Sequence, residues 1–155
     1  GATSAAPPSA TAPRALAPGD VVPALQLDGL DGVPVVLEQL RGRPVLINVW
    51  ASWCAPCVEE MPELARFAAA QPEDGVQVIG LALDDAEAVR AFLERVPVGY
   101  PIALDTPGPD DASVALGNAR GLLPYTVLID ARGRMLKNKL GPFEHGEIEG
   151  WVGEP

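Results

Sequence analysis

Cys54 and Cys57, the only two cysteines of the chain, are separated by two residues. They follow a continuous apolar run rich in β-branched residues, Val45–Trp50, which is typical of a strand buried on both faces. The apolar residues after them recur at the spacing of one helix face, at Met61, Leu64, Ala65 and Ala68. The two thiols are therefore expected at a strand-to-helix turn, where they could exchange with disulfides.

The start of a helix is a favourable place for a thiolate. Unpaired backbone N–H groups and the positive end of the helix dipole lower the pKa of a thiol there, so Cys54 is expected to be the nucleophile. Pro56 suits the first helical turn because no N–H is needed at that position. Cys57 lies deeper in the turn, where it could attack a mixed disulfide formed on Cys54 and release the product.

Two other uses of a cysteine pair are less favoured. A purely structural disulfide across two intervening residues would close too short a loop to remove much entropy from the unfolded chain. A zinc site needs about four ligands, and His145 is the only histidine. The pattern thus favours thiol–disulfide exchange, with neither a metal nor a cofactor expected.

The residues around the pair, Trp-Ala-Ser-Trp-Cys-Ala-Pro-Cys (50–57) followed by Glu60 and Pro62, resemble the active-site signature of the thioredoxin superfamily. They are more particularly similar to the bacterial TlpA/ResA-like group of extracytoplasmic thiol-disulfide oxidoreductases, which includes the CcmG/DsbE proteins of cytochrome c maturation. The resemblance runs from about Gly19 to the C-terminus. It implies an α/β thioredoxin fold, a central mixed β-sheet flanked by helices, with an added N-terminal β-hairpin.

The resemblance also assigns substrate-binding roles. Pro124 matches the cis-proline that packs beside the cysteines, although in isolation it reads as any strand-opening proline, for which trans is the default. Leu123 would then offer its backbone to an extended substrate. Trp53, directly before Cys54, is a rim aromatic that could also shield the thiolate and provide a docking surface.

A candidate for proton transfer follows from two further positions. Asn48 stands where thioredoxins have a buried aspartate beneath the resolving cysteine, so no carboxylate is available there. Glu60, three residues after Cys57, is the candidate substitute if partial burial raises its pKa. The alternative is a solvated helix glutamate like its neighbours Glu59 and Glu63.

The rest of the chain alternates between strand and helix patterns. Val21–Leu37 contains two alternating apolar runs around a glycine turn, which predicts the hairpin. Val76–Leu83 reads as a second buried strand, and Asp84 as the N-cap of the helix after it. Further strands are expected over 100–104, 122–130 and 134–140, with a last helix over about 144–152.

Composition sets the domain organisation. Residues 1–18, almost wholly Ala, Pro, Ser, Thr and Gly, predict a disordered tether, and residues 19–155 a single thioredoxin-like domain. A net charge of −10 argues against nucleic acid and anionic membranes as partners. The chain starts at Gly1, so we expect that a signal peptide or membrane anchor was removed, and we expect a monomer.

The predicted function is dithiol–disulfide exchange with protein substrates. By resemblance, the protein would be a reductant in the bacterial cell envelope, periplasmic or anchored to the membrane before processing. It would be supplied by a membrane electron donor of the DsbD/CcdA type and act in cytochrome c maturation or a similar pathway. An oxidant that introduces disulfides would use the same residues. A Cu(I)-handling protein for oxidase assembly and a redox-inert docking domain are the alternatives from other classes.

Overall fold

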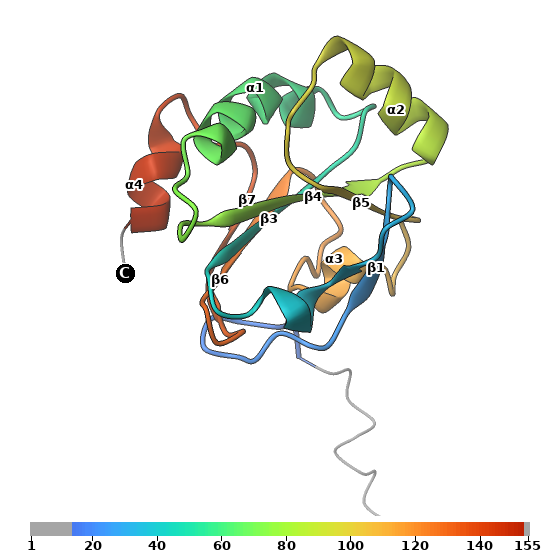
Figure 1. The fold of residues 1–155 in the computed structure, drawn as a ribbon. Helices are drawn as coiled ribbons and strands as arrows, with labels where there is room; N and C mark the ends of the chain where they lie inside the picture. Colours follow the sequence, from blue (N-terminus) through green and yellow to red (C-terminus); the bar gives the residue numbers. More distant parts are fainter. Residues whose placement is uncertain (1–13, 154–155) are drawn as a thin grey trace, which may run out of the picture.

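The computed structural model describes residues 14–153, which build a seven-stranded mixed β-sheet with helices on both faces (Figure 1). The strand order is β2-β1-β5-β4-β3-β6-β7. The strands are β1 (Gln26–Gly29), β2 (Val35–Val36), β3 (Val45–Trp50), β4 (Gln77–Leu83), β5 (Ile102–Asp105), β6 (Tyr125–Ile129) and β7 (Met135–Leu140). The helices are the short 3₁₀ helix η2 (Leu37–Leu40), α1 (Ala55–Ala69), α2 (Ala86–Arg95), α3 (Ala112–Ala115) and α4 (Glu147–Gly153).

Strand β3 is the centre of the sheet. All six of its residues are buried, as the apolar run predicts. It pairs in parallel with β4 and antiparallel with β6. Because side chains alternate along a strand, Leu46 and Trp50 pack into the core on one face and Ile47 into the core on the other. The start of α1 therefore follows a strand that is fixed by buried side chains on both faces of the sheet.

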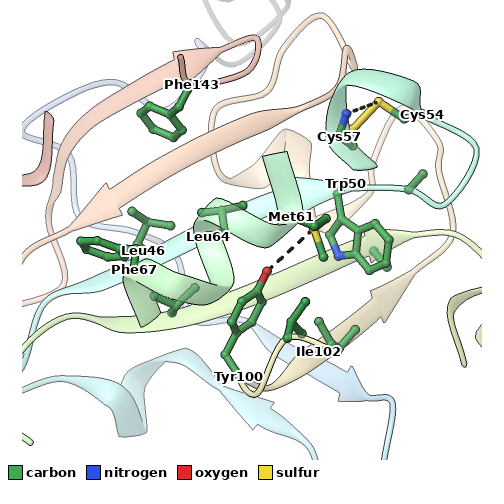
Figure 2. Close-up of a cluster of buried hydrophobic side chains, with 14 of the residues drawn as sticks. Leu46, Trp50, Cys54, Cys57, Met61, Leu64, Phe67, Tyr100, Ile102 and Phe143 are labelled. Atoms are coloured by element: carbon green, nitrogen blue, oxygen red, sulfur yellow. Dashed lines mark hydrogen bonds between the residues drawn. A yellow bond between two sulfur atoms is a disulfide. The ribbon is translucent and has the colours of Figure 1, made fainter. Parts of the chain in front are cut away.

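The two faces of the sheet have separate cores. Helices α1, α2 and α4 cover one face, and α3 and η2 lie on the other (Figure 1). Under α1, the indole of Trp50 is wholly buried and its ring centroid lies 5.3 Å from that of Phe92 in α2. Met61 and Leu64 of α1 point into the same core (Figure 2). These residues supply the apolar helix face expected after the cysteines.

The N-terminal hairpin is present and extends the main sheet. Leu27 of β1 lies opposite Val35 of β2. On its other side, β1 is antiparallel to β5, with Asp28 opposite Leu104. The hairpin thus adds two strands to the β5 edge, which agrees with the fold implied by the resemblance.

Two predicted helix starts are wrong. The N-cap of α2 is Asp85, whose side chain accepts a hydrogen bond from Ala88 N, and not Asp84. Helix α4 begins at Glu147 and not near residue 144, because Gly146 has φ +80°, which breaks the helical backbone before it. For α2, the neighbouring aspartates Asp84 and Asp85 carry the same capping signal, and only the structure distinguishes them.

The described chain begins against the domain. Arg14 pairs with Asp20 at 2.8 Å, and Leu16 packs on the core beneath the sheet. The rest of the predicted tether, residues 1–13, lies outside the described residues. Among residues 14–153, no helix is both long enough and apolar enough to cross a membrane.

Candidate active site

Cys54 is the N-cap of α1 and is joined to Cys57 by a disulfide. The backbone N–H of Cys57 donates a hydrogen bond to Cys54 Sγ at 3.4 Å (Figure 2). Cys54 keeps 7% of its surface exposed, whereas Cys57 is completely buried. A sulfur that accepts an N–H bond at a helix N-terminus is stabilised as a thiolate, and only Cys54 is open to a partner. The predicted position of the pair, at a strand-to-helix turn, is confirmed.

The turn between β3 and α1 is held by a residue whose role the sequence did not reveal. Asp84, at the end of β4, accepts hydrogen bonds from the backbone N–H of Ser52, at 2.9 Å, and from its hydroxyl. This contact explains why Asp84 does not cap α2. It ties the segment just before Trp53 and Cys54 to the neighbouring strand.

Glu60 lies on the buried side of α1, one turn after Cys57. It is only 4% exposed, so it is not a solvated helix glutamate. Its Oε1 accepts a hydrogen bond from Asn48 Nδ2 at 2.8 Å, and its Oε2 accepts one from the backbone N–H of Phe143 at 2.8 Å. Asn48 also donates to Thr126 Oγ1 at 3.1 Å. The carboxyl is thus held by β3 and by the segment after β7, and Asn48 links it to β6.

Burial raises the pKa of Glu60 above its ordinary value of 4.5. The hydrogen bonds from Phe143 and Asn48 and the charge of Lys139 act in the opposite direction but do not cancel that effect. A carboxyl with a raised pKa can exchange a proton closer to neutral pH than a solvated glutamate can. The direction of the shift and its cause are those that the sequence led us to expect.

The side-chain oxygen of Asn48 accepts no hydrogen bond from the described residues. Asn48 is fully buried, and its Oδ1 has no hydrogen-bond partner within the described residues. In the present orientation of the amide, Nδ2 donates to a Glu60 carboxylate; turned over, Oδ1 would accept a bond from a Glu60 carboxylic acid. The pair can therefore accommodate Glu60 in either protonation state without leaving it unpaired.

The predicted substrate-binding residues lie beside the disulfide. Leu123 packs against the core cluster that contains both cysteines, and the Leu123–Pro124 peptide bond is cis, as the resemblance implied. Trp53 is 66% exposed. Trp53 and Leu123 line one groove of about 360 Å³. Gly141 N donates to the carbonyl of Pro124 at 2.8 Å, which fixes the proline against the end of β7.

Comparison with known proteins agrees with this geometry. The family model described as Redoxin matches residues 17–151. The thiol-disulfide oxidoreductase ResA of a Bacillus cereus strain is 30% identical over 136 residues, which cover 86% of this chain and 76% of ResA. ResA of Bacillus subtilis (strain 168) is 27% identical, covering 90% of this chain and 76% of its own.

Solved structures give the same result. A protein from Chlorobium tepidum, provisionally named thiol:disulfide interchange protein DsbE, superposes with a TM-score of 0.76 at 29% identity, covering 88% of this chain and 94% of its own. A thioredoxin-related protein from Neisseria meningitidis serogroup B gives 0.71 at 32% identity, covering 81% and 95%. The fold and site are those of a thioredoxin-fold thiol-disulfide oxidoreductase. The chain belongs to the redoxin family and is a TlpA/ResA-like member of the thioredoxin superfamily.

Two site contacts had no sequence signal. The partner of Glu60 Oε2 is the backbone N–H of Phe143, a group that every residue type except proline carries. The partner of Ser52 is an aspartate with an equally good place as a helix cap. Within the described residues, no group of three or more His, Cys, Asp or Glu side chains is arranged to hold a metal ion.

Proposed function

We propose that the protein is a reductant of protein disulfides in the bacterial cell envelope, with Cys54 as the nucleophile and Cys57 as the resolving thiol. The observation that carries the proposal is the N-cap position of Cys54, where its sulfur accepts the N–H of Cys57 while retaining access to solvent. A thiolate at this position is stabilised before any substrate arrives.

The reaction proceeds from the dithiol form. The Cys54 thiolate attacks one sulfur of a substrate disulfide, which forms a mixed disulfide and releases the other substrate sulfur as a thiolate. Cys57, deprotonated, then attacks Cys54 Sγ, which forms the Cys54–Cys57 disulfide and releases the second substrate sulfur. Two electrons pass to the substrate, and the two released thiolates take up protons.

Glu60 accepts the proton that Cys57 loses during resolution. Both residues lie on the buried side of α1, one helical turn apart, where side chains are neighbours. The raised pKa of Glu60 supports this role, because it favours the protonated carboxyl. The Asn48 amide supports it as well, because it can hydrogen-bond to either protonation state of Glu60.

Leu123, Pro124 and Trp53 bind the substrate. The backbone of Leu123 pairs with an extended segment around the substrate cysteine, in the manner of an added strand. Trp53 provides an exposed apolar surface in the same groove.

The partners follow from the family. An envelope reductant needs electrons from a membrane protein of the DsbD/CcdA type, and apocytochrome c cysteines are the expected substrates. We place the protein in the periplasm, as a monomer. The ResA and DsbE names of its relatives support the thiol–disulfide exchange on which this part of the proposal rests.

Trapping of the mixed disulfide tests the proposal. Reduced Cys57→Ser protein, mixed with a disulfide-containing protein such as an oxidised apocytochrome fragment, should accumulate an adduct through Cys54 that mass spectrometry detects. The reduced Cys54→Ser variant should give no adduct, because Cys57 is buried. An adduct through Cys57, or none with either variant, would contradict the assignment.

A further inference from the structure

We propose that Arg120 is a specificity-determining residue that binds a carboxylate of the protein substrate, on an aspartate or glutamate close to the cysteine under attack. This inference rests on the proposed exchange with protein substrates and adds the charge of the segment that is preferred.

Among the described residues that line the groove shared by Trp53 and Leu123, Arg120 is the one charged side chain without a partner. The groove shared by Trp53 and Leu123 has two charged lining residues, Asp111 and Arg120. Asp111 Oδ1 accepts bonds from the backbone and hydroxyl of Ser113 at 2.8 and 2.7 Å, and its Oδ2 accepts one from Gly108 N at 3.0 Å. Arg120 is exposed and makes no hydrogen bond or ion pair with another residue of the described range. Its guanidinium is therefore available to a ligand, whereas the carboxylate is not.

The loop that carries Arg120 is held in place from below. Asn118, 2% exposed, donates through Nδ2 to Ser113 Oγ at 3.3 Å and to the carbonyl of Leu122 at 3.1 Å. Gly121 N donates to the carbonyl of Asn118 at 3.1 Å. Arg120 is thus presented by an anchored turn, which lowers the entropy lost when it binds a partner.

The same loop leads into the proposed substrate-binding backbone. Arg120 precedes Leu123 by three residues. An extended peptide advances about 3.3 Å per residue, so a side chain within about four residues of the substrate cysteine can reach the guanidinium while the peptide pairs with Leu123. Arginine binds carboxylates through two parallel hydrogen bonds, which makes this contact selective for Asp and Glu.

The net negative charge of the protein increases the effect of Arg120 on substrate selection. The chain has a net charge of −10, with 11 lysines and arginines against 21 acidic residues. An acidic substrate segment is repelled by most of this surface, so an unpaired arginine in the groove that Trp53 lines next to Cys54 selects where such a segment can dock.

Single-turnover kinetics test the proposal. Pre-reduced protein, freed of reductant, is mixed with peptides of equal length that carry one internal disulfide and either Glu, Gln or Lys beside one cysteine. The readout is the ratio of second-order rate constants for the Glu and Gln peptides. We expect Arg120→Ala to lower this ratio about two- to fivefold, as for an exposed ion pair. In Arg120→Glu the Glu peptide should react more slowly than the Gln peptide, and the Lys peptide should react fastest. High salt should reduce the wild-type ratio.

Arg132→Ala is the matched control. Arg132 is also exposed, and its loss changes the net charge by the same amount, but it lies in the turn after β6, at the opposite end of that strand from Pro124. Its ratio should equal that of the wild type. An unchanged ratio in both Arg120→Ala and Arg120→Glu would overturn the inference. Failure of the wild-type protein to reduce any peptide would instead refute the proposed function itself, so the two failures are distinguishable.

Discussion

Replacement of Glu60 by glutamine separates a proton-transfer role from a structural one. In Glu60→Gln, the side-chain oxygen can still accept the N–H of Phe143. Its new Nε2 can donate to Asn48 Oδ1, the acceptor that has no partner among the described residues of the wild-type protein, once the Asn48 amide turns over. The variant therefore keeps both hydrogen bonds and removes a buried charge.

The magnitudes follow from those contacts. Two charge-assisted hydrogen bonds become neutral ones, which costs about 1 kcal/mol each. The substitution also removes the cost of burying a carboxylate. That cost is larger than the contribution of the two hydrogen bonds, because the pKa of Glu60 is raised in spite of them. At pH 8 we expect the free energy of unfolding to rise by on the order of 1 kcal/mol. Glu60→Ala leaves Phe143 N–H and Asn48 Nδ2 short of a partner, at about 1–3 kcal/mol for each group, so it should be destabilised.

The assay follows release of substrate from a preformed mixed disulfide on Cys54, as a function of pH. In Glu60→Gln, the rate near pH 7 should fall about 100-fold or more, and the part of the pH profile due to Glu60 should disappear. Glu59→Gln is the control, because Glu59 is a glutamate next to it on α1 that is not buried. If Glu60→Gln resolves at the wild-type rate with an unchanged pH profile, Glu60 has no part in proton transfer.

Three further perturbations test the energetics of the fold. The pKa of Glu60 is raised in the folded state, so the stability that its protonated form contributes is complete below pH 4.5 and is lost as the pH rises through the raised pKa. Denaturant titrations at several pH values should show this decline in the wild type and not in Glu60→Gln. Gly80→Ala should lose about 1–2 kcal/mol in thermal unfolding, since the added methyl would lie 2.8 Å from Ile102 Cδ1 and 3.2 Å from Trp50 Nε1; no loss would mean that this core yields more easily than its packing indicates. Asp85→Ala should cost about 1 kcal/mol through loss of the α2 cap, with disulfide exchange unchanged, and a slower exchange would mean that this residue also supports the active-site turn.

Local patterns in the sequence were enough to predict the centre of the fold. Val45–Trp50 is buried on both faces, and a run that is apolar except for Asn48 has few other stable places in a small domain. Cys54 is the N-cap of α1, which begins a few residues after β3, and Pro56 suits the first helical turn, where no N–H is needed. These positions depend on near neighbours in the chain, which is why periodicity revealed them.

Contacts between distant segments could not be predicted in the same way. Asp84 and Asp85 carry the same capping chemistry, and only the approach of Ser52 from the end of β3 assigns one to the active-site turn and the other to α2. The hydrogen bond from Phe143 to Glu60 joins residues 83 positions apart through a backbone group. Arg120 had no motif around it, and its place in the groove shared by Trp53 and Leu123 depends on how its loop folds.

The equilibrium reduction potential of the Cys54–Cys57 pair tests the central claim most directly. It can be measured from the fluorescence of Trp50 and Trp53 in glutathione and dithiothreitol buffers, because Trp53 adjoins Cys54 and Trp50 shares its core cluster. A value near about −270 mV, in the range of thioredoxin, is the result expected of an envelope reductant. A value approaching about −120 mV would mean that the protein introduces disulfides, and the proposed direction of electron transfer would be wrong.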